Sequence, residues 1–556
     1  MRGCSMKIAI DGNSLTLAQI GAVARGEAKV VITDDPVVLA GVAQSRQVIV
    51  DAVARGEQIY GVTTLFGGMA DVHVTREQLI DVQRIALWHH RSTTGPRLPQ
   101  ADVRAAMLLR ANSLLRGASG VRMELIERLV AFLNGGATPH VFQRGSIGAS
   151  GDLVPLTYIG ASIIGLSPDF LVDMDGEAVD CVTALARLGY APIDPEPKEG
   201  LALNNGTGAC TGVAANVMLR ALDALALSLG VHALFAQALL ATDQSFERFI
   251  HAQKPHPGQV WVAARMAELV RGAATIRSEA GGARDARAGG LIQDRYGSRC
   301  LPQFIGPIVD GLATAARQIT TEANTANDNP LIDPASGETF HSGNFLAQYT
   351  AIAMDNTRYL IGLMCKHIDS QIAHLITPAF SNGLTPALVG NMETGVNVGL
   401  KSLHIGMNQM ATQISYLGQS VADRFPTHAD MYNQNINSQG MNAANLARDQ
   451  MDVVEHYLAG ALLTAVQAVE IRSRITAGNC DARSILSPAT APLYLAARHA
   501  AGGEPDPAKT MLWDDMDGFI QPKLEGILAD ITDRGPTYSA FDDLRADLAI
   551  FCAQPR

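Results

Sequence analysis

The sequence of 556 residues lacks several features that would point to common classes of partner. It contains no basic run, and its 43 Lys and Arg residues are outnumbered by 54 Asp and Glu residues, which gives a formal charge of −11. Nucleic acids and anionic membranes attract proteins through excess positive charge, so we expect neither as the main partner. The seven cysteines are scattered without a CxxC pair, which predicts reduced thiols and neither a disulfide framework nor a zinc site.

Long uninterrupted hydrophobic segments are also absent. At the N-terminus a very short apolar run is followed at once by Asp11, which predicts that there is no signal peptide. The most apolar long stretch, residues 221–242, contains Asp223, His232 and Gln237, and these polar groups would be costly in lipid. We therefore expect a buried helix there, and a soluble, cytoplasmic protein.

The usual nucleotide, metal and nucleophile motifs are missing as well. The chain has no P-loop, HExxH or EF-hand pattern. Residues 206–212 have the spacing GxGxxxG, one residue too long for a dinucleotide fingerprint, and Asp152 stands where a nucleophile elbow requires glycine. We therefore expect neither a nucleotide cofactor nor a bound metal.

Most of what is present predicts helix. Hydrophobic residues make up 47% of the chain, and residues 103–116 and 123–133 are rich in strong helix formers. Longer segments with a period near 3.6 follow at residues 211–242, 262–276, 308–324, 345–376, 396–417 and 443–475. Strand signals are weak and confined to short pieces such as residues 30–33 and 170–173. The sequence predicts a mainly α protein whose core is a bundle of long helices.

A loop rich in proline and charge, residues 192–199, is the best candidate for a domain boundary. We expect a smaller N-terminal domain, residues 1–200, and a helical bundle core with C-terminal helices, residues 201–556. Glycine- and amide-rich segments interrupt the apolar helices at residues 60–68, 145–156, 203–206, 293–299 and 433–440. An apolar bundle does not require so many polar groups, and those it buries must be satisfied or bind a ligand.

Together these segments resemble those of the aromatic amino acid ammonia-lyases and aminomutases, the family that contains histidine, tyrosine and phenylalanine ammonia-lyases. The resemblance covers nearly the whole chain and is closest to the short bacterial phenylalanine/tyrosine type. Its most specific part is GSIGASGDLVPL, residues 145–156. In the family, Ala-Ser-Gly at this place cyclises autocatalytically into the electrophilic group 4-methylidene-imidazol-5-one. The resemblance therefore implies this prosthetic group at Ala149-Ser150-Gly151, in the N-terminal domain.

The tripeptide alone is not distinctive, because Ala-Ser-Gly also occurs at residues 118–120 and 335–337. Cyclisation requires the Gly151 nitrogen to attack the Ala149 carbonyl, and this needs a tightly bent backbone. Gly145 and Gly148 permit such bends around the middle copy. The other two copies are expected at a helix end and in a turn.

The resemblance also assigns the site residues. The catalytic residues are Tyr60, Ala149, Ser150, Gly151, Asn205, Tyr296, Arg299 and Gln434. The substrate-binding residues are Gly67, His89, His90, Leu153, Gln293, Phe345, Lys401, Asp430 and Asn433. Tyr60 is the implied base for the substrate's β-proton, and Arg299 is the implied bidentate partner of its carboxylate. A free tyrosine has a pKa of about 10, so positive charge or dipoles must lower the pKa of Tyr60 for work near pH 8.

Three positions depart from the usual family motifs. Leu65 replaces a glycine in the loop that carries Tyr60, Gly208 replaces a serine, and Asp430 stands where close relatives carry glutamate. The shorter Asp430 side chain reduces the reach of its carboxylate toward the substrate amine.

The adjacent residues His89 and His90 occupy the positions that distinguish substrates within the family. A histidine at the first position can bond a phenol, and it would be left unpaired beside a phenyl ring. We therefore expect L-tyrosine to be converted to p-coumarate and ammonia. Phenylalanine or broad aryl-alanine activity, histidine ammonia-lyase activity, a 2,3-aminomutase reaction and an inactive helical scaffold remain as alternatives.

Assembly is implied by the same resemblance. Members of the family form homotetramers in which each active site takes segments from three chains. Long apolar helices agree with this, because much of their surface needs burial against neighbours. We expect a homotetramer with shared active sites, acting on a small aromatic amino acid.

Overall fold

The described residues, 6–278 and 293–554 of a computed structural model, form two compact units. Unit 1 comprises Met1–Leu219, Ala315–Asn356 and Ser420–Arg448, and unit 2 comprises Arg220–Thr314, Thr357–Gln419 and Asp449–Arg556. Each unit is therefore assembled from three separate stretches of sequence. The predicted boundary near residue 200 instead divides the chain into two consecutive parts, and it stays a prediction.

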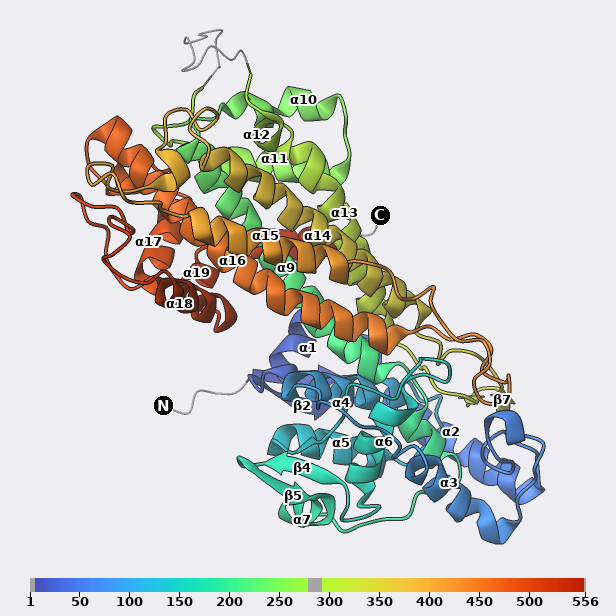
Figure 1. Cartoon of the computed structure of the whole chain (residues 1–556). Helices are drawn as coiled ribbons and strands as arrows, with labels where there is room; N and C mark the ends of the chain where they lie inside the picture. The colour runs from blue at the N-terminus through green and yellow to red at the C-terminus, as the bar shows by residue number, and fades with distance from the viewer. Residues whose placement is uncertain (1–5, 279–292, 555–556) are drawn as a thin grey trace. The chain divides into compact units, whose positions relative to one another are not determined.

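Unit 1 combines short helices with three small sheets (Figure 1). Its helices are α1 (Leu17–Ala24), α2 (Pro36–Arg55), α3 (Leu79–Trp88), α4 (Gln100–Leu114), α5 (Met123–Gly135), α6 (Leu153–Ile164), α7 (Cys181–Arg187) and α8 (Glu199–Asn204). Its strands are β1 (Met6–Ile10), β2 (Ala28–Ile32), β3 (Thr138–Pro139), β4 (Leu171–Met174), β5 (Glu177–Asp180), β6 (Leu331–Asp333) and β7 (Glu338–Phe340). The pair β1–β2 is parallel, whereas β3–β4–β5 and β6–β7 are antiparallel.

The core of unit 1 is built around α4, which is buried along nearly its whole length. It packs against α1 and α5, while α8 packs between α3 and α6. A second apolar cluster joins α2 to the β6 strand through Ile49, Ala52 and Ile332. This packing fixes α8, whose C-terminal end leads directly to Asn205.

Four long helices contain residues of both units. They are α9 (Gly208–Ala238), α13 (Leu301–Glu322), α14 (Gln348–Leu375) and α16 (Gly440–Ala477). The helices confined to unit 2 are α10 (Arg248–Ala252), α11 (Pro257–Val270), α12 (Tyr296–Arg299), α15 (Lys401–Leu417), α17 (Ala491–Ala500), α18 (Gln521–Thr532), α19 (Pro536–Ser539) and α20 (Asp542–Ala553).

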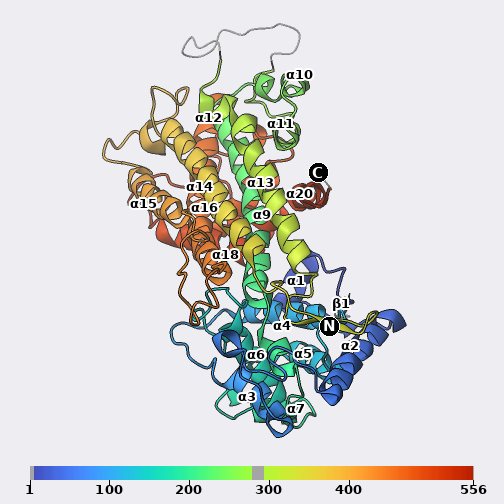
Figure 2. The ribbon, with the colours of Figure 1, turned by 90° about the vertical axis from the view of Figure 1, so that its right-hand side faces the viewer.

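Within unit 2 the long helices lie side by side as a bundle (Figures 1 and 2). Buried and partly buried polar contacts join them. The Tyr457 hydroxyl of α16 donates to the carbonyl of Cys365 on α14. Arg220 of α9 pairs with Glu455 of α16 at 2.8 Å. The predicted mainly α fold with a core of long helices is confirmed.

The helix predicted around residues 221–242 is also confirmed, because α9 is a core helix with 78% of its most apolar window buried. By length and composition alone, α9 and α2 could each cross a membrane. The α2 helix carries polar side chains in contacts, however, since Gln47 donates to Asp51 at 2.8 Å and Arg46 pairs with Glu196.

One predicted helix has different bounds in the structure, and one long helix was not predicted. The predicted helix over residues 262–276 begins earlier and ends at Val270, because Arg271 is extended and Gly272 has a left-handed φ of 82°. The helix α2 was not predicted, although Asp35 caps its first turn, Pro36 occupies its first position and left-handed Gly56 ends it.

Candidate active site

Ser150 lies between two amide side chains from distant parts of unit 1. The Nδ2 of Asn205 donates to the Ser150 carbonyl at 2.6 Å, and the Nε2 of Gln434 donates to the Ser150 hydroxyl at 3.1 Å. The segment that carries Gln434 also holds the preceding turn, because the Ser438 amide donates to the Gly148 carbonyl at 3.1 Å. The structure thus brings together Ser150, Asn205 and Gln434, which are predicted site residues.

The backbone at Gly151 is pressed closely against Gly206. The two residues form an isolated parallel bridge, and the Asp152 amide donates to the Gly206 carbonyl at 2.7 Å. Gly151 has a φ of 75°, and a Cβ there would collide with that same carbonyl. Behind it, a Cβ on Gly206 would collide with Nη1 of Arg110 and Oδ1 of Asn327. Both positions therefore require glycine, because a Cβ on either residue would clash with its neighbours.

Asp152 is fully buried beside this contact and braces the turn. Its carboxylate accepts from the Cys210 amide at 2.7 Å and from the Ser146 hydroxyl at 3.1 Å. Burial raises the pKa of Asp152 above its ordinary value, while these donors oppose the shift. The carboxylate therefore anchors the first turn of α9 to the residues around Gly151.

These residues fit a prosthetic group formed from Ala149-Ser150-Gly151. Ala149 and Gly151 are buried, and the bent backbone is held on both sides. In addition, the Oδ1 of Asn205 is buried and accepts no hydrogen bond from the described residues. A buried acceptor without a donor is costly, so it is well placed to receive a donor from a bound molecule or a modified backbone.

Tyr60 lies in a loop closed by its own hydroxyl. The Gly67 amide donates to the Tyr60 oxygen at 2.8 Å, and Thr63 and Thr64 bond the amides of Ile59 and Gly61. Gly67 is required here because its φ is 57° and a Cβ would collide with the Asp430 carboxylate. The Tyr60 loop therefore stands directly against the segment that carries Asp430 and Gln434.

The environment of Tyr60 within unit 1 raises its pKa. Burial has the largest effect, the Gly67 amide opposes it, and the nearby charge of Asp430 adds to it. This direction is opposite to the one that a base working near pH 8 needs. Among the residues that the structure describes, no positive charge influences the pKa of Tyr60.

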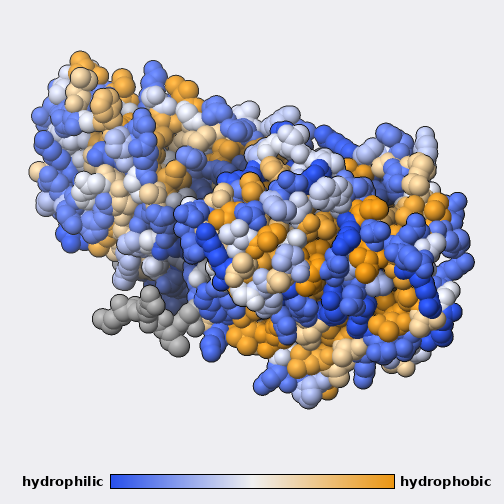
Figure 3. Space-filling model, turned by 90° about the horizontal axis from the view of Figure 1, so that it is seen from below, coloured by the Kyte–Doolittle hydropathy of each residue, from blue (hydrophilic) through white to orange (hydrophobic). Residues whose placement is uncertain are grey.

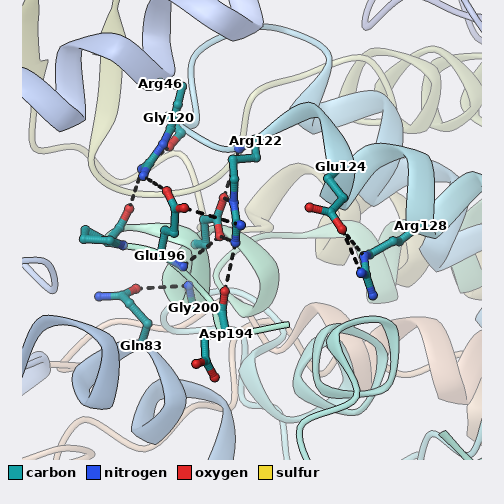
Figure 4. Close-up of polar contacts among 11 residues, drawn as sticks. Arg46, Gln83, Gly120, Arg122, Glu124, Arg128, Asp194, Glu196 and Gly200 are labelled. Atoms are coloured by element: carbon teal, nitrogen blue, oxygen red, sulfur yellow. Dashed lines mark hydrogen bonds and ion pairs between the residues drawn. The ribbon is translucent and has the colours of Figure 1, made fainter. Parts of the chain in front are cut away.

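A buried glutamine links the Tyr60 loop to α8. The Nε2 of Gln83 donates to the Gly61 carbonyl at 2.9 Å, and its Oε1 accepts from the Gly200 amide at 3.0 Å. Figure 4 shows Gln83 reaching Gly200 beside the arginine cluster that fastens the preceding loop. In that cluster Arg122 bonds buried Glu199 at 2.6 Å, and Arg46 donates to the Pro197 carbonyl at 2.9 Å.

The rings of His89 and His90 lie side by side at the end of α3, with centroids 3.8 Å apart and an angle of 44° between their planes. The Nδ1 of His89 lies 3.0 Å from the Ile85 carbonyl, and that of His90 lies 2.8 Å from the Ala86 carbonyl. A carbonyl only accepts, so each Nδ1 must carry a proton. Burial lowers the pKa of His90 to about 4, so His90 is neutral at pH 7 and its Nε2 is an acceptor.

The other predicted residues of unit 1 have the following places. Leu153 is the first residue of α6 and is partly buried, as is Phe345 before α14. Asp430 has a left-handed φ of 52° and is exposed, and its carbonyl accepts from the Asn433 amide at 2.9 Å. Met431 and Tyr432 are also left-handed, so this turn is strained.

Four predicted residues belong to unit 2. Tyr296 and Arg299 form the ends of the one-turn helix α12, and Gln293 lies just before it. The Arg299 guanidinium lies over the Tyr296 ring at 4.8 Å, and its Nε donates to the Asp294 carbonyl at 3.1 Å. Lys401 is exposed at the start of α15.

Sequence reasoning missed several residues that support the site. His341 stands edge-on to Tyr60 with centroids 6.5 Å apart, and its Nε2 accepts from the Tyr60 amide at 3.4 Å. It lies in the HSGNF segment that also contains Phe345, which is the signal that could have identified it. Arg110 lies within a predicted helix, Gln83 lies within α3, which was not predicted, and neither residue carries a comparable local signal.

A comparison with protein families identifies the kind of protein that this chain resembles. A model described as aromatic amino acid lyase matches residues 15–499. The chain is 80% identical to an aromatic ammonia-lyase of Loktanella atrilutea, over 99% of this chain and 100% of that protein. It is 49% identical to a phenylalanine ammonia-lyase of Nostoc punctiforme, over 97% of this chain and 95% of that protein.

Solved structures give the same result. A tyrosine aminomutase from Streptomyces globisporus superposes with a TM-score of 0.86 at 29% identity, over 97% of this chain and 99% of that chain. A histidine ammonia-lyase from Trypanosoma cruzi has a TM-score of 0.83 at 23% identity, over 99% of this chain and 98% of that chain, and shares the fold.

Proposed function

The chain belongs to the aromatic amino acid lyase family, and from this premise we propose that it removes ammonia from L-tyrosine to give p-coumarate. The observation that carries the proposal is that Asn205 and Gln434 both bond Ser150 of the Ala149-Ser150-Gly151 turn, while the Tyr60 loop lies against the segment that carries Gln434. The loop makes this contact through Gly67.

The prosthetic group 4-methylidene-imidazol-5-one would supply an electrophilic carbon for the substrate amine, chemistry that no ordinary side chain provides. Asn205 and Gln434 would hold it, because they already bond the carbonyl and hydroxyl of Ser150. The free Oδ1 of Asn205 offers a further acceptor at the same place. Asp152 and Gly206 keep the backbone bent and exclude water on the buried side.

Tyr60 would act as the base that takes the β-proton. The Gly67 amide already stabilises the phenolate form by donating to the Tyr60 oxygen. Burial and Asp430 raise the pKa of Tyr60, so the base needs a positive charge from outside its present surroundings. Arg299 on α12 would bind the substrate carboxylate through its planar guanidinium. We propose that the arginine motif, which contains Arg299, supplies the positive charge that Tyr60 needs as a base.

The choice of tyrosine rests on the two histidine rings. Because each Nδ1 donates to a backbone carbonyl, the neutral form of either imidazole presents an unprotonated Nε2 atom, and burial keeps His90 in that form. Such atoms accept a hydrogen bond from a phenol hydroxyl and gain nothing from a phenyl ring. The name of the Nostoc relative favours phenylalanine as the second candidate substrate.

We further propose a cytoplasmic homotetramer with shared active sites. Hydrophobic residues form several patches among hydrophilic ones on the face seen in Figure 3. On the long helices, Tyr349, Ile352 and Tyr359 of α14 and Ile405 and Tyr416 of α15 are exposed. Because so many apolar side chains are exposed, association with further copies of the chain, which would bury them, is favoured.

A competition assay tests the function. Purified protein is given equal L-tyrosine, L-phenylalanine and L-histidine, and p-coumarate, cinnamate, urocanate and β-amino acids are quantified together. We expect p-coumarate to dominate. Cinnamate or urocanate as the main product would overturn the substrate, and β-amino acids would overturn the lyase reaction. Intact mass should show the loss of two waters in the wild type and not in Ser150→Ala; an active Ser150→Ala variant would disprove the prosthetic group.

His89→Phe tests the specificity argument. Removing the acceptor should shift the ratio of kcat/KM values from tyrosine toward phenylalanine by about 10- to 100-fold. His73→Phe, at a histidine in the strand-like bridge with Thr64, is the matched control and should leave the ratio unchanged. An unchanged ratio in His89→Phe would refute the role given to His89.

A further inference from the structure

The short helix α12 cannot hold itself in place. It has only four residues, Tyr296–Arg299, and a single helical turn is unfavourable without tertiary support. It carries Arg299, to which the proposed function gives a role in substrate binding. The contacts that fix α12 therefore decide where the Arg299 guanidinium lies.

One support comes from Asp294, two residues before the helix. The Asp294 carboxylate accepts from the Thr242 amide at 2.8 Å and from Arg277 at 3.1 Å. The Asp294 carbonyl in turn accepts from the Nε of Arg299 at 3.1 Å. This support acts on the N-terminal side of α12.

The second support lies within the helix and comes from α14. The Nε2 of Gln371 donates to the Gly297 carbonyl at 2.7 Å, and Gln371 is only 1% exposed. The Gly297 backbone can approach this closely because it has no side chain, and a Cβ there would already lie 3.3 Å from the Cγ of Gln371. Gln371 therefore links the bundle directly to α12.

The orientation of the Gln371 amide is fixed by a buried histidine. Its Oε1 lies 2.5 Å from the Nδ1 of His232 on α9. Because the carbonyl of Gly297 can only accept, Nε2 must face Gly297 and Oε1 must face His232, whose Nδ1 then donates. If the Gln371 amide were flipped, Oε1 would face the carbonyl oxygen of Gly297, and Nε2 would face the donating Nδ1 of His232. His232 thus selects the one orientation in which Gln371 holds α12.

Aromatic packing keeps the His232 ring from turning. His232 meets the ring of His367 edge-on at 4.9 Å and 75°, and His367 stacks on Phe304 of α13 at 4.9 Å and 26°. His232 and His367 are buried, whereas Phe304 is exposed. A series of contacts connects the packed faces of α9, α13 and α14 to the backbone of α12. It runs from Phe304 through His367, His232 and Gln371 to Gly297.

We propose that Gln371, oriented by His232, is a positioning residue for Arg299, so that these two buried side chains set the affinity for the substrate carboxylate. The inference rests on the proposed role of Arg299. A bidentate guanidinium–carboxylate pair requires accurate placement, and a small displacement of α12 weakens it. Arg299 would bind the carboxylate before and during the reaction, so its displacement raises KM more than it lowers kcat.

The test compares Gln371→Met, which keeps the length of the side chain and loses the donor, with the wild type and with Arg299→Ala. We measure KM, kcat, the melting temperature and the Kd of the product acid p-coumarate by calorimetry, which needs no turnover. Gln371→Met should raise KM and the product Kd about tenfold, in line with the loss of one accurately placed contact. In the Arg299→Ala background the same substitution should have no further effect on the product Kd.

The double substitution separates positioning from general damage, because a merely structural role would weaken binding equally in both backgrounds. Equal losses, or an unchanged Kd in Gln371→Met, would overturn this inference alone. An unchanged Kd in Arg299→Ala would overturn the carboxylate role of Arg299 and the inference with it. If Gln371→Met does not fold, His232 supplies the same test. His232→Asn retains a donor near the position of Nδ1 and should bind like the wild type, whereas His232→Leu should bind more weakly; equal binding would refute the proposal.

Discussion

At the scale of single residues, the three Ala-Ser-Gly tripeptides show what distinguishes the predicted prosthetic-group site. Gly120, Gly151 and Gly337 all have left-handed φ values, of 68°, 75° and 73°. A Cβ at Gly337 would meet open space and one at Gly120 would meet side chains, whereas one at Gly151 would meet the backbone of Gly206. All three tripeptides therefore end in a glycine with a left-handed φ, but among them it is the glycine of the middle copy that lies directly against another backbone segment.

This contact predicts that Gly206→Ala blocks maturation of the site. The added methyl would collide with Arg110 and Asn327, and relief of the collision must move the Gly206 carbonyl away from Gly151. We expect a folded protein without the loss of two waters in its intact mass, and activity at least about 100-fold lower because a misplaced reacting group costs that much. Gly362→Ala on α14, where a Cβ meets open space, is the control and should mature normally. Normal dehydration in Gly206→Ala would contradict the role of the backbone contact.

At the scale of elements, the Tyr60 loop and α8 are coupled through one buried amide. We predict that Gln83→Met lowers kcat about tenfold, because the Gly61 carbonyl and the Gly200 amide both lose their partner and Tyr60 loses its fixed position. The free energy of unfolding should also fall by about 1–3 kcal/mol. Steady-state kinetics and thermal melting check both effects. Gln47→Met on the exposed face of α2 is the matched control, and equal effects of the two substitutions would refute the coupling.

The elements also show how far the sequence could predict this structure. Long periodic segments gave the main helices, because α9, α13, α14 and α16 bury apolar faces that repeat along the chain. The helix α2 was missed, since its many β-branched residues weaken the helical pattern while its caps at Asp35 and Gly56 remain readable. Motifs identified the segments that meet at Ser150, whereas Arg110 and Asn327 are 217 positions apart and meet Gly206 only through the fold.

The pKa of Tyr60 is the clearest limit of sequence reasoning at the site. A positive charge beside the base was expected, but burial and Asp430 dominate within unit 1 and raise the pKa. Neither the depth of burial nor the neighbouring carboxylate is encoded in the YGVTT motif itself. Both depend on the loop at residues 429–434, which folds back on itself through the Ala429–Gln434 bridge.

At the scale of the whole molecule, buried neutral histidines make stability depend on pH. Burial lowers the pKa of His232 to about 3, below the ordinary value of about 6.5 that applies after unfolding. The unfolded chain therefore binds a proton that the folded chain excludes, so the contribution of His232 is complete above pH 6.5 and declines as the pH falls toward 3. At pH 5 the loss amounts to about 2 kcal/mol. The drop in melting temperature between pH 7 and pH 5 should be smaller in His232→Asn than in the wild type, and unchanged in the exposed-site control His256→Asn. An equal drop in all three proteins would contradict the neutral, buried state of His232.

The division of the predicted site between two units of the chain leads to a test of shared active sites. Tyr60 belongs to unit 1 and Arg299 to unit 2. If a site takes these residues from different chains of a homotetramer, Tyr60→Phe and Arg299→Ala are each inactive alone but complement each other when co-expressed. Random mixing of equal amounts places both intact residues together in about a quarter of the sites. We therefore expect about a quarter of the wild-type kcat from the co-expressed pair, against almost none from the separately purified variants mixed without subunit exchange. If one chain supplied both residues, every site would lack one of them, and the co-expressed pair would be as inactive as either variant.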